Sequence, residues 1–518
     1  MAASGIDQSY GNLKALAAEL RKAAIDAYMA ERSYDKEEAQ GRYINRHLSQ
    51  IRGEETVTLP DADGYNGGAG GSGGLFTGGK SYSEQFKEIT DKIDSTLKRW
   101  FGVPDPSGFD TPISDYKKAI GKMSLSGCGI ELQGGDVALP NGAEAGIIGP
   151  NMDALGKSSG IMTGKAMTAF KNQFTVTMPR VVKNLYLAMN VHLAYLIAEK
   201  NLMDQAREKI TNIVVGAIEV FTQLANKNKG ISKELAMDLG GVALGLASAP
   251  FSGGASLSLA VSGGTAALST IKAVEDEVKR REEKSRNIGA ADYKTAMNNF
   301  VLAADGLNAN LKESEEKIND QIQSNTSVIW GDAKSKTYDT ANFHVLPAPI
   351  NDLTGQEGDL VLGKDLAVSR SEVDLITLKS EQGGYMPKIY DEVVSAANSI
   401  SGLTMATAAR REHATLGRGA TGPSFRFGEM KDAIYELLLD LSWRIEVGIV
   451  NLRAAMDDLE QQDDASSKRI QAIADLSAQG SGVNPWDRSP QSGTNLKQLP
   501  QDVDPTTMAQ IQELMKPK

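Results

Sequence analysis

Cysteine and aromatic residues are scarce in this sequence. Cys128 is the only cysteine among 518 residues, so neither an internal disulfide nor a cage of thiolate ligands can hold the fold together. We expect Cys128 to be a buried packing residue, as small free cysteines commonly are. Aromatic residues make up only 6% of the chain, which favours helices packed through small side chains over a thick globular core.

A basic excess is also missing. The formal net charge is −11 and the sequence pI is about 5.2, so no surplus of Lys and Arg is available to neutralise phosphates. This excludes nucleic acid as an expected partner. Residues 1–50 have no apolar stretch after a basic start, so we expect no Sec signal peptide. The protein is then expected to be cytoplasmic until a leaderless route exports it.

Compact catalytic and metal-binding signatures are absent as well. The histidines are His47, His192, His344 and His413, and none belongs to a motif with metal-ligand spacing. Paired acids at 457–458 and 463–464 end a helical pattern, which is typical of a solvated face. We therefore predict no catalytic residue, no metal and no cofactor, and we expect that the protein is not an enzyme.

Residues 417–422 read G-R-G-A-T-G and match the G-x-G-x-x-G pattern that cradles pyrophosphate between a strand and a helix. Here the pattern follows helical sequence and is closed by Pro423. We interpret it as a loop, and a dinucleotide site is the less favoured alternative.

Helical periodicity dominates what is present. A helix is expected from Asp7 to about Ile51, and a stripe through residues 151–226 is interrupted by Pro179, where we expect a kink or a break. Apolar residues at 300–318 recur at intervals of four and three. The same spacing forms a helix seam later in the chain, carried by Ile434, Leu438, Leu441, Ile445, Leu452 and Leu459. Such seams require partner helices.

The sequence therefore predicts an all-α fold, an elongated multi-helix bundle of long helices with an apolar helical hairpin and irregular connections. Residues 124–150 are expected to hold two short strands or only loop, and residues 340–382 an irregular connection. The predicted parts are an N-terminal helical segment (1–65), a Gly-rich linker (66–80), a first helical region (81–232), the apolar hairpin (233–272), a long helix (273–345), a C-terminal helical region (346–475) and a disordered tail (476–518).

The hairpin is predicted from a charge-free segment. No charged residue occurs from Leu239 to Ile271, and Pro250 with the residues after it divides the segment into two arms rich in Gly, Ala and Ser. Small residues allow two helical backbones to approach closely. The apolar residues expected to mediate membrane contact or assembly are Leu239, Leu244, Leu246, Phe251, Leu257, Leu259 and Val261.

Two short motifs resemble those of the helical proteins of the actinobacterial type VII, or ESX, secretion system. Residues 100–102 form a W-x-G turn with Trp100 and Gly102, and Tyr34 with Glu38 forms a Y-x-x-x-E export signature. Gly164 lies in a second turn where relatives often carry W-x-G, although Met162 replaces the tryptophan. The resemblance implies a helical hairpin at the W-x-G turn and a secreted, non-enzymatic protein at the cell envelope.

A second class also fits the order of the parts. In α-helical pore-forming toxins, long helices bracket an apolar hairpin that inserts into a membrane, and the uncharged segment 239–271 lies between two long helical patterns. We rank secretion-associated assembly first and pore formation second. The expected partners are a second copy of the chain or another helical protein, with a membrane as the alternative partner.

Overall fold

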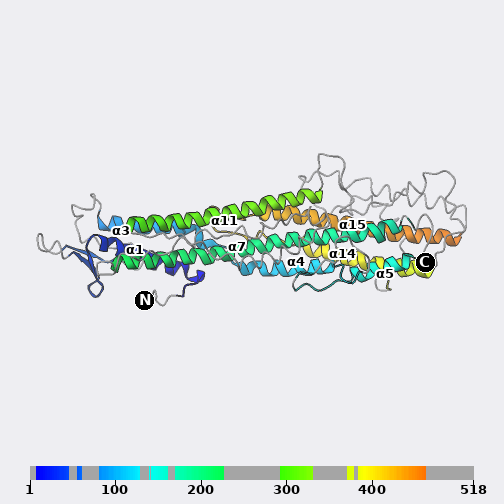
Figure 1. The fold of residues 1–518 in the computed structure, drawn as a ribbon, viewed down its shortest axis with the longest axis horizontal. Coiled ribbons are helices and arrows are strands. Elements are labelled where there is room, and N and C mark those ends of the chain that lie inside the picture. Colours follow the sequence, from blue (N-terminus) through cyan, green and yellow to red (C-terminus); the bar gives the residue numbers. More distant parts are fainter. Residues whose placement is uncertain are drawn as a thin grey trace.

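The protein is an elongated rod of long helices that lie side by side along one axis (Figure 1). A computed structural model describes residues 7–45, 55–60, 81–128, 139–140, 142–160, 168, 170–226, 292–330, 370–377 and 383–461. The predicted all-α class is confirmed, because helices form most of the described chain and one small sheet accounts for the strands. The predicted linker, apolar hairpin and tail lie outside the described residues.

Helix α7 (Met178–Asn226) is the central element of the rod. Every residue from Val181 to Glu199 is buried, so this half of the helix is surrounded on all sides. From Leu202 to Phe221 buried residues recur at helical intervals and alternate with exposed ones, so the second half of the helix is amphipathic.

A π-helical turn, η5 (Asn172–Thr177), leads directly into α7. Pro179 lacks the N–H that an α-helix needs, and its ring would collide with the carbonyl four residues earlier. The wider turn is the type of irregularity that accommodates such a conflict. The chain therefore does not break at Pro179 but stays helical from Asn172 onward.

One half of the rod, the sheet half, contains α1 (Leu13–Glu31), α3 (Tyr82–Leu97) and the small sheet. Helix α1 packs along the amphipathic half of α7 and against α3. Helix α3 begins with a capping box, in which the Ser81 hydroxyl accepts the Glu84 amide and the Glu84 carboxylate accepts the Ser81 amide.

The expected helix from Asp7 to about Ile51 ends at Glu31, so that prediction is wrong over the described residues 32–45. Ser33 adopts φ +63°, which ends the helix, and the chain then forms β1 (Asp35–Glu37), the 3₁₀ turn η2 (Glu38–Gln40), β2 (Arg42–Asn45) and β3 (Glu55–Thr58). The strands pair antiparallel in the order β1-β2-β3, with Lys36 opposite Tyr43 and Tyr43 opposite Val57. Tyr43 fixes the sheet to the rod, because its hydroxyl donates to Asp26 Oδ1 at 2.6 Å.

The other half, the α15 half, contains α4 (Asp110–Lys122), α5 (Ile148–Gly160), α13 (Arg370–Thr377), α14 (Tyr385–Ser401) and α15 (Ser424–Gln461). Helix α14 packs on α15, α4 and α5. Helix α13 lies within the region predicted to be an irregular connection, so that prediction is wrong over these eight residues. The described part of 124–147 contains no strand and is loop.

Helix α11 (Tyr293–Trp330) packs on both α7 and α15. The partner helices that the two heptad-spaced segments require are therefore α7 and each other. Figure 1 shows α7 and α11 as the two elements that run through both halves of the rod.

Helices α1, α3, α4, α14 and α15 each begin or end at the mid-rod junction. We define this junction as η1 (Tyr10–Asn12), η3 (Lys98–Gly102), η4 (Pro106–Phe109), the loop 402–423 and the parts of α7 and α11 beside them. The Tyr10 hydroxyl donates to the Trp100 carbonyl at 2.5 Å and accepts the Val103 amide at 3.0 Å. These hydrogen bonds join the start of α1 to the end of α3.

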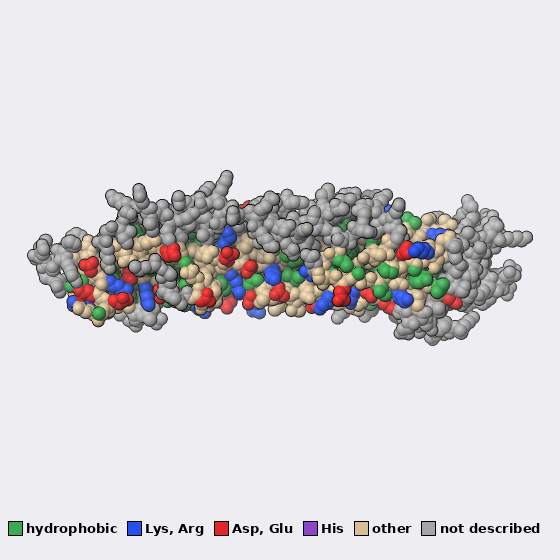
Figure 2. Space-filling model, turned by 60° about the horizontal axis from the view of Figure 1, so that its bottom comes forward, with side chains coloured by type: hydrophobic (Ala, Val, Ile, Leu, Met, Phe, Trp, Pro, Cys, Tyr) green, Lys and Arg blue, Asp and Glu red, His purple; other side chains and the backbone are tan. Residues whose placement is uncertain are grey.

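The surface is mixed in charge. Acidic and basic side chains alternate along the face shown in Figure 2, and apolar side chains gather towards the α15 half. The exposed large apolar residues among those described are Ile147, Val176, Leu302, Leu375 and Phe425. Residues Asn172–Asn226 are long and apolar enough to cross a membrane, but their apolar window is 100% buried inside the rod, as expected for a core helix.

Candidate functional site

The predicted helix seam is in the core of the α15 half. Ile434, Leu438, Leu441, Ile445 and Leu452 are all buried on α15. The side chain of Leu459 lies outside the described residues. The seam includes a close approach at Gly448, where an added Cβ would lie 2.2 Å from Cζ of Phe174. Only glycine fits opposite this ring.

The W-x-G turn occupies the mid-rod junction and does not join a hairpin. Trp100 is fully buried in η3, and an added Cβ at Gly102 would lie 2.6 Å from Cβ of Glu412 in the loop 402–423. Helices α3 and α4 lie in opposite halves of the rod (Figure 1). The expected hairpin is therefore wrong for this turn, because the short segment from Gly102 to Asp110 carries the chain onward along the rod. Gly164 lies outside the described residues.

The export signature is divided between a buried ring and an exposed carboxylate. Tyr34 follows the end of α1, is buried, and bonds through its hydroxyl to that of Tyr82 at 3.0 Å with an edge-on ring contact. Glu38 is 86% exposed in η2 and lies 3.6 Å from Lys36 Nζ. Tyr34 thus helps to hold the sheet, whereas Glu38 is accessible to a partner.

The seven apolar residues of the predicted hairpin lie outside the described residues, but both flanks of their segment are described. The ring centroids of Phe221, near the end of α7, and Tyr293, at the start of α11, are 5.7 Å apart. Tyr28 of α1 makes an edge-on contact with Tyr293 at 5.3 Å. The chain therefore leaves α7 and enters α11 at the same end of the rod.

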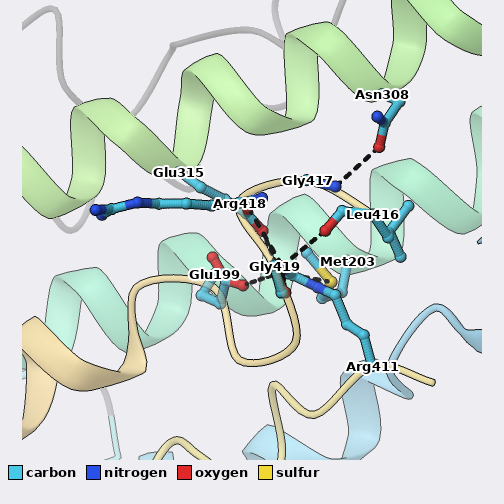
Figure 3. A network of polar contacts seen from close by, with 9 residues as sticks. All are labelled: Glu199, Met203, Asn308, Glu315, Arg411, Leu416, Gly417, Arg418 and Gly419. Atoms are coloured by element: carbon cyan, nitrogen blue, oxygen red, sulfur yellow. Dashed lines mark hydrogen bonds and ion pairs between the residues drawn. The ribbon is translucent and has the colours of Figure 1, made fainter. Parts of the chain in front are cut away.

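A buried ionic cluster at the mid-rod junction was not predicted from the sequence. The Arg411 guanidinium donates to Glu199 Oε1 at 2.9 Å and to Glu315 Oε1 (Figure 3). Its Nη1 also donates to the Gly419 carbonyl at 2.8 Å. All three charged side chains are 0% exposed. One cation from the loop is thus held between carboxylates of α7 and α11.

The glycine-rich loop encloses this cluster. Gly417, Gly419 and Gly422 have φ of +57°, +125° and +53°, a region that residues with a Cβ rarely adopt. An added Cβ at Gly417 would lie 2.5 Å from Glu315 Oε2, and one at Gly422 would lie 2.8 Å from Arg411 Nη2. Glycine is therefore required here for two reasons: it adopts the left-handed backbone, and it leaves room for the charged groups of the cluster.

The backbone of this loop binds an internal anion. The Arg418 amide donates to Glu315 Oε2 at 2.5 Å, and the Gly417 amide donates to Asn308 Oδ1 at 2.8 Å (Figure 3). Of these two consecutive amides, only that of Arg418 binds the Glu315 carboxylate, and that of Gly417 binds a neutral amide oxygen. The loop also follows α14 rather than a strand. These contacts agree with the loop interpretation of G-x-G-x-x-G.

Burial controls the protonation of the cluster. Desolvation and the neighbouring Glu315 carboxylate raise the pKa of Glu199 to about 8, against a smaller lowering by Arg411. Desolvation also raises the pKa of Glu315, against lowering by Arg411 and the Arg418 amide. Glu199 Oε2 and Arg411 Nε have no hydrogen-bond partner among the described residues. The cluster therefore favours a neutral Glu199 near pH 7.

A second buried polar group joins α4, α7 and α15. The Tyr116 hydroxyl bonds to Nδ1 of His192 at 2.7 Å, and Nε2 of His192 bonds to the Phe427 carbonyl at 2.9 Å. Since the carbonyl only accepts, Nε2 carries the proton and Tyr116 donates to Nδ1. Desolvation lowers the pKa of His192 to about 3, so the ring is neutral. The two hydrogen bonds therefore join the three helices in the core without a buried charge.

Glu199 and Glu315 had a signal in the sequence. Glu199 follows Tyr195 by four residues and precedes Leu202 by three, and Glu315 stands in the same way between Leu311 and Ile318. Carboxylates at such positions of an apolar stripe indicate a buried charge that needs a partner. The described residues contain no group of three or more His, Cys, Asp or Glu that could hold a metal ion.

No family model, curated protein or solved structure matches the chain. The geometry of the rod and of its charged junction therefore carries the functional argument.

Proposed function

We propose that the chain is a non-enzymatic rod that presents the uncharged segment 239–271 to a membrane, as α-helical pore-forming proteins do. The observation that carries the proposal is the pairing of Phe221 with Tyr293 at one end of the rod. Because α7 ends and α11 begins there, the uncharged segment departs from and returns to a single end. Transfer of such a segment into lipid avoids the cost of desolvating charges.

The burial of α7 supports the same proposal. Its apolar window is wholly enclosed by other helices, so α7 stabilises the rod instead of serving as a membrane span. The described surface carries interspersed acidic and basic side chains (Figure 2). The uncharged run outside the described residues is then the element best suited to lipid, and the rod supplies its support.

Dye release from lipid vesicles tests this proposal with two matched substitutions. We expect the wild type and Leu302→Asp to release dye, because Leu302 is 67% exposed on α11 and outside the uncharged segment. Leu257→Asp should abolish release while leaving helical circular dichroism and the melting temperature unchanged, because it puts a charge into the segment. Absence of release by the wild type from both neutral and anionic vesicles would overturn the proposal.

Secretion-associated assembly is the second candidate function. It is supported by Glu38, which is 86% exposed a few residues after the end of α1, near the buried Tyr34. In this case the protein acts through a second copy or a helical partner at the cell envelope. Glu38→Ala should then keep the protein inside the producing cell, whereas Glu31→Ala, also exposed and close to the end of α1, should not.

The two candidates differ in measurable ways. An assembly protein should form an oligomer by mass photometry and release no dye from vesicles. Equal secretion of Glu38→Ala and Glu31→Ala would remove the export signature from the second candidate. Dye release that depends on Leu257 would decide for the first.

A further inference from the structure

The mid-rod cluster carries more negative than positive groups. Arg411 supplies one charge, and Glu199 and Glu315 supply two carboxyl groups within hydrogen-bonding distance of it. If both carboxyl groups were ionised, one net negative charge would be enclosed at 0% exposure. An uncompensated buried charge is among the most destabilising features that a fold can carry. A proton on one of the carboxyl groups removes the imbalance.

We propose that Glu199 and Glu315 hold one proton between them, and that its loss to solvent base releases the loop 402–423 from α7 and α11. This inference concerns the regulation of the fold and does not depend on the proposed membrane role. The geometry supports it directly, since Arg411 is the only cation whose contacts reach both carboxylates among the described residues.

The other charged groups near the cluster do not contact its carboxylates. Helix α7 contributes Glu199 and the Met203 sulfur to the cluster, and α11 contributes Glu315. The loop contributes Arg411 and the Arg418 amide. Glu412 and the Arg418 side chain are exposed on the loop, and His413 is half-buried there. The neighbouring pairs are Lys200–Asp110, Arg207–Asp105 and Lys312–Glu316. Among the described residues, no cation other than Arg411 contacts either carboxylate.

The loop 402–423 is the segment that would be displaced if the buried cluster became negatively charged. It contacts the sheet half through Glu412, which packs against Gly102, and α11 through Asn308, whose Nδ2 donates to the Thr415 carbonyl at 3.2 Å. The Arg411 amide also donates to the Ala420 carbonyl at 2.9 Å, which closes the loop on the cluster. Expulsion of Arg411 or of an ionised Glu199 therefore opens the contacts that hold the loop to η3, α7 and α11.

The sign of the pH effect follows from the raised pKa of Glu199. A carboxyl group whose pKa is higher in the folded state than in the unfolded state stabilises the fold at low pH, and this stabilisation is lost as pH rises. The window extends from the ordinary value of 4.5 to about 8. Above about 8 the closed junction has itself lost the proton, so the stability that the proton contributes is gone.

Hydrogen–deuterium exchange of residues 411–422 between pH 5 and pH 10 tests the proposal on the full-length chain. After correction for intrinsic exchange, wild-type protection should fall by up to about tenfold per pH unit as pH rises towards about 8, because opening then releases one proton, and should be constant above about 8. Glu199→Gln should remove this fall, because a neutral side chain has no proton to lose. Glu316→Gln, an exposed neighbour on α11, should behave as the wild type does.

A direct readout of the proton makes the test independent of loop dynamics. Infrared difference spectra between the wild type and Glu199→Gln at pH 7 should contain the C=O band of a protonated carboxyl group. Glu315→Gln, which removes the main anionic partner of Arg411, should lower protection already at pH 7. Identical pH dependence of wild type and Glu199→Gln, or the absence of the carboxyl band, would overturn the proposal.

Discussion

The two halves of α7 present the same helix in two environments. From Val181 to Glu199 every side chain is enclosed, whereas from Leu202 to Phe221 only one face is covered. In the amphipathic half, polar residues can face water, so they reduce the stability of the fold very little. In the enclosed half, polar residues such as Asn190, His192 and Glu199 must find partners in the core. The enclosed half therefore contains the specific polar contacts that select one arrangement of the surrounding helices.

The largest expected effect comes from aspartate substitutions that compare these halves. Ala188→Asp in the enclosed half should destabilise the protein by about 4 kcal/mol or more, because no rotamer lets the carboxylate reach water. Asn212→Asp, at an exposed position of the amphipathic half, should change stability by less than about 0.5 kcal/mol. Urea unfolding measures both. Equal midpoints would show that the enclosed half is open to solvent.

A smaller effect is expected from the pH dependence of His192. Its pKa is lowered from 6.5 to about 3, chiefly by burial and further by Lys431, so the unfolded chain binds a proton that the folded chain does not. Stability should therefore decrease as pH falls below about 6.5, with a loss of about 2 kcal/mol at pH 5.

His192→Gln isolates this contribution, since the variant lacks the titrating group while Glu199 still titrates in both proteins. The difference in unfolding free energy between wild type and variant should change with pH over this range. His413→Gln, outside α7, controls for the loss of a histidine. Parallel curves for wild type and His192→Gln would contradict a neutral buried ring.

The smallest expected effect concerns two glycines of α15. Gly448→Ala should cost about 1–3 kcal/mol, because the new Cβ meets the Phe174 ring at the entrance to the enclosed half of α7. Gly428→Ala should instead stabilise by about 0.5–1 kcal/mol, since no atom lies within 4 Å of its added Cβ and alanine favours a helix. Melting temperatures that shift in the same direction would refute the close contact.

The sequence predicts much of the rod because its helices bury one face. The heptad spacing from Ile434 to Leu452 and from Phe300 to Ile318 corresponds to buried stripes of α15 and α11. The small sheet was missed because its strands are only three or four residues long, and the turn at Ser33 depends on a left-handed backbone that serine rarely adopts. Short strands carry too little alternation to be distinguished from the end of a helix.

The mid-rod cluster was beyond sequence reasoning for another reason. Glu199 and Glu315 stand at apolar positions, but their partner Arg411 lies 212 and 96 residues away along the chain. Periodicity reports burial within one helix and not which distant segment supplies the counter-charge. The three glycines of the loop were recognised as a pattern, yet the anion that they enclose came from within the protein.

The pairing of Phe221 with Tyr293 also bears on the chain that connects α7 to α11. Two antiparallel helices that are fixed to each other need little from the chain that connects them, and each doubling of a loop costs only about 0.6 kcal/mol. The contact of Phe221 with Tyr293 and the packing of α7 on α11 therefore hold the two ends of this connection together whatever its length.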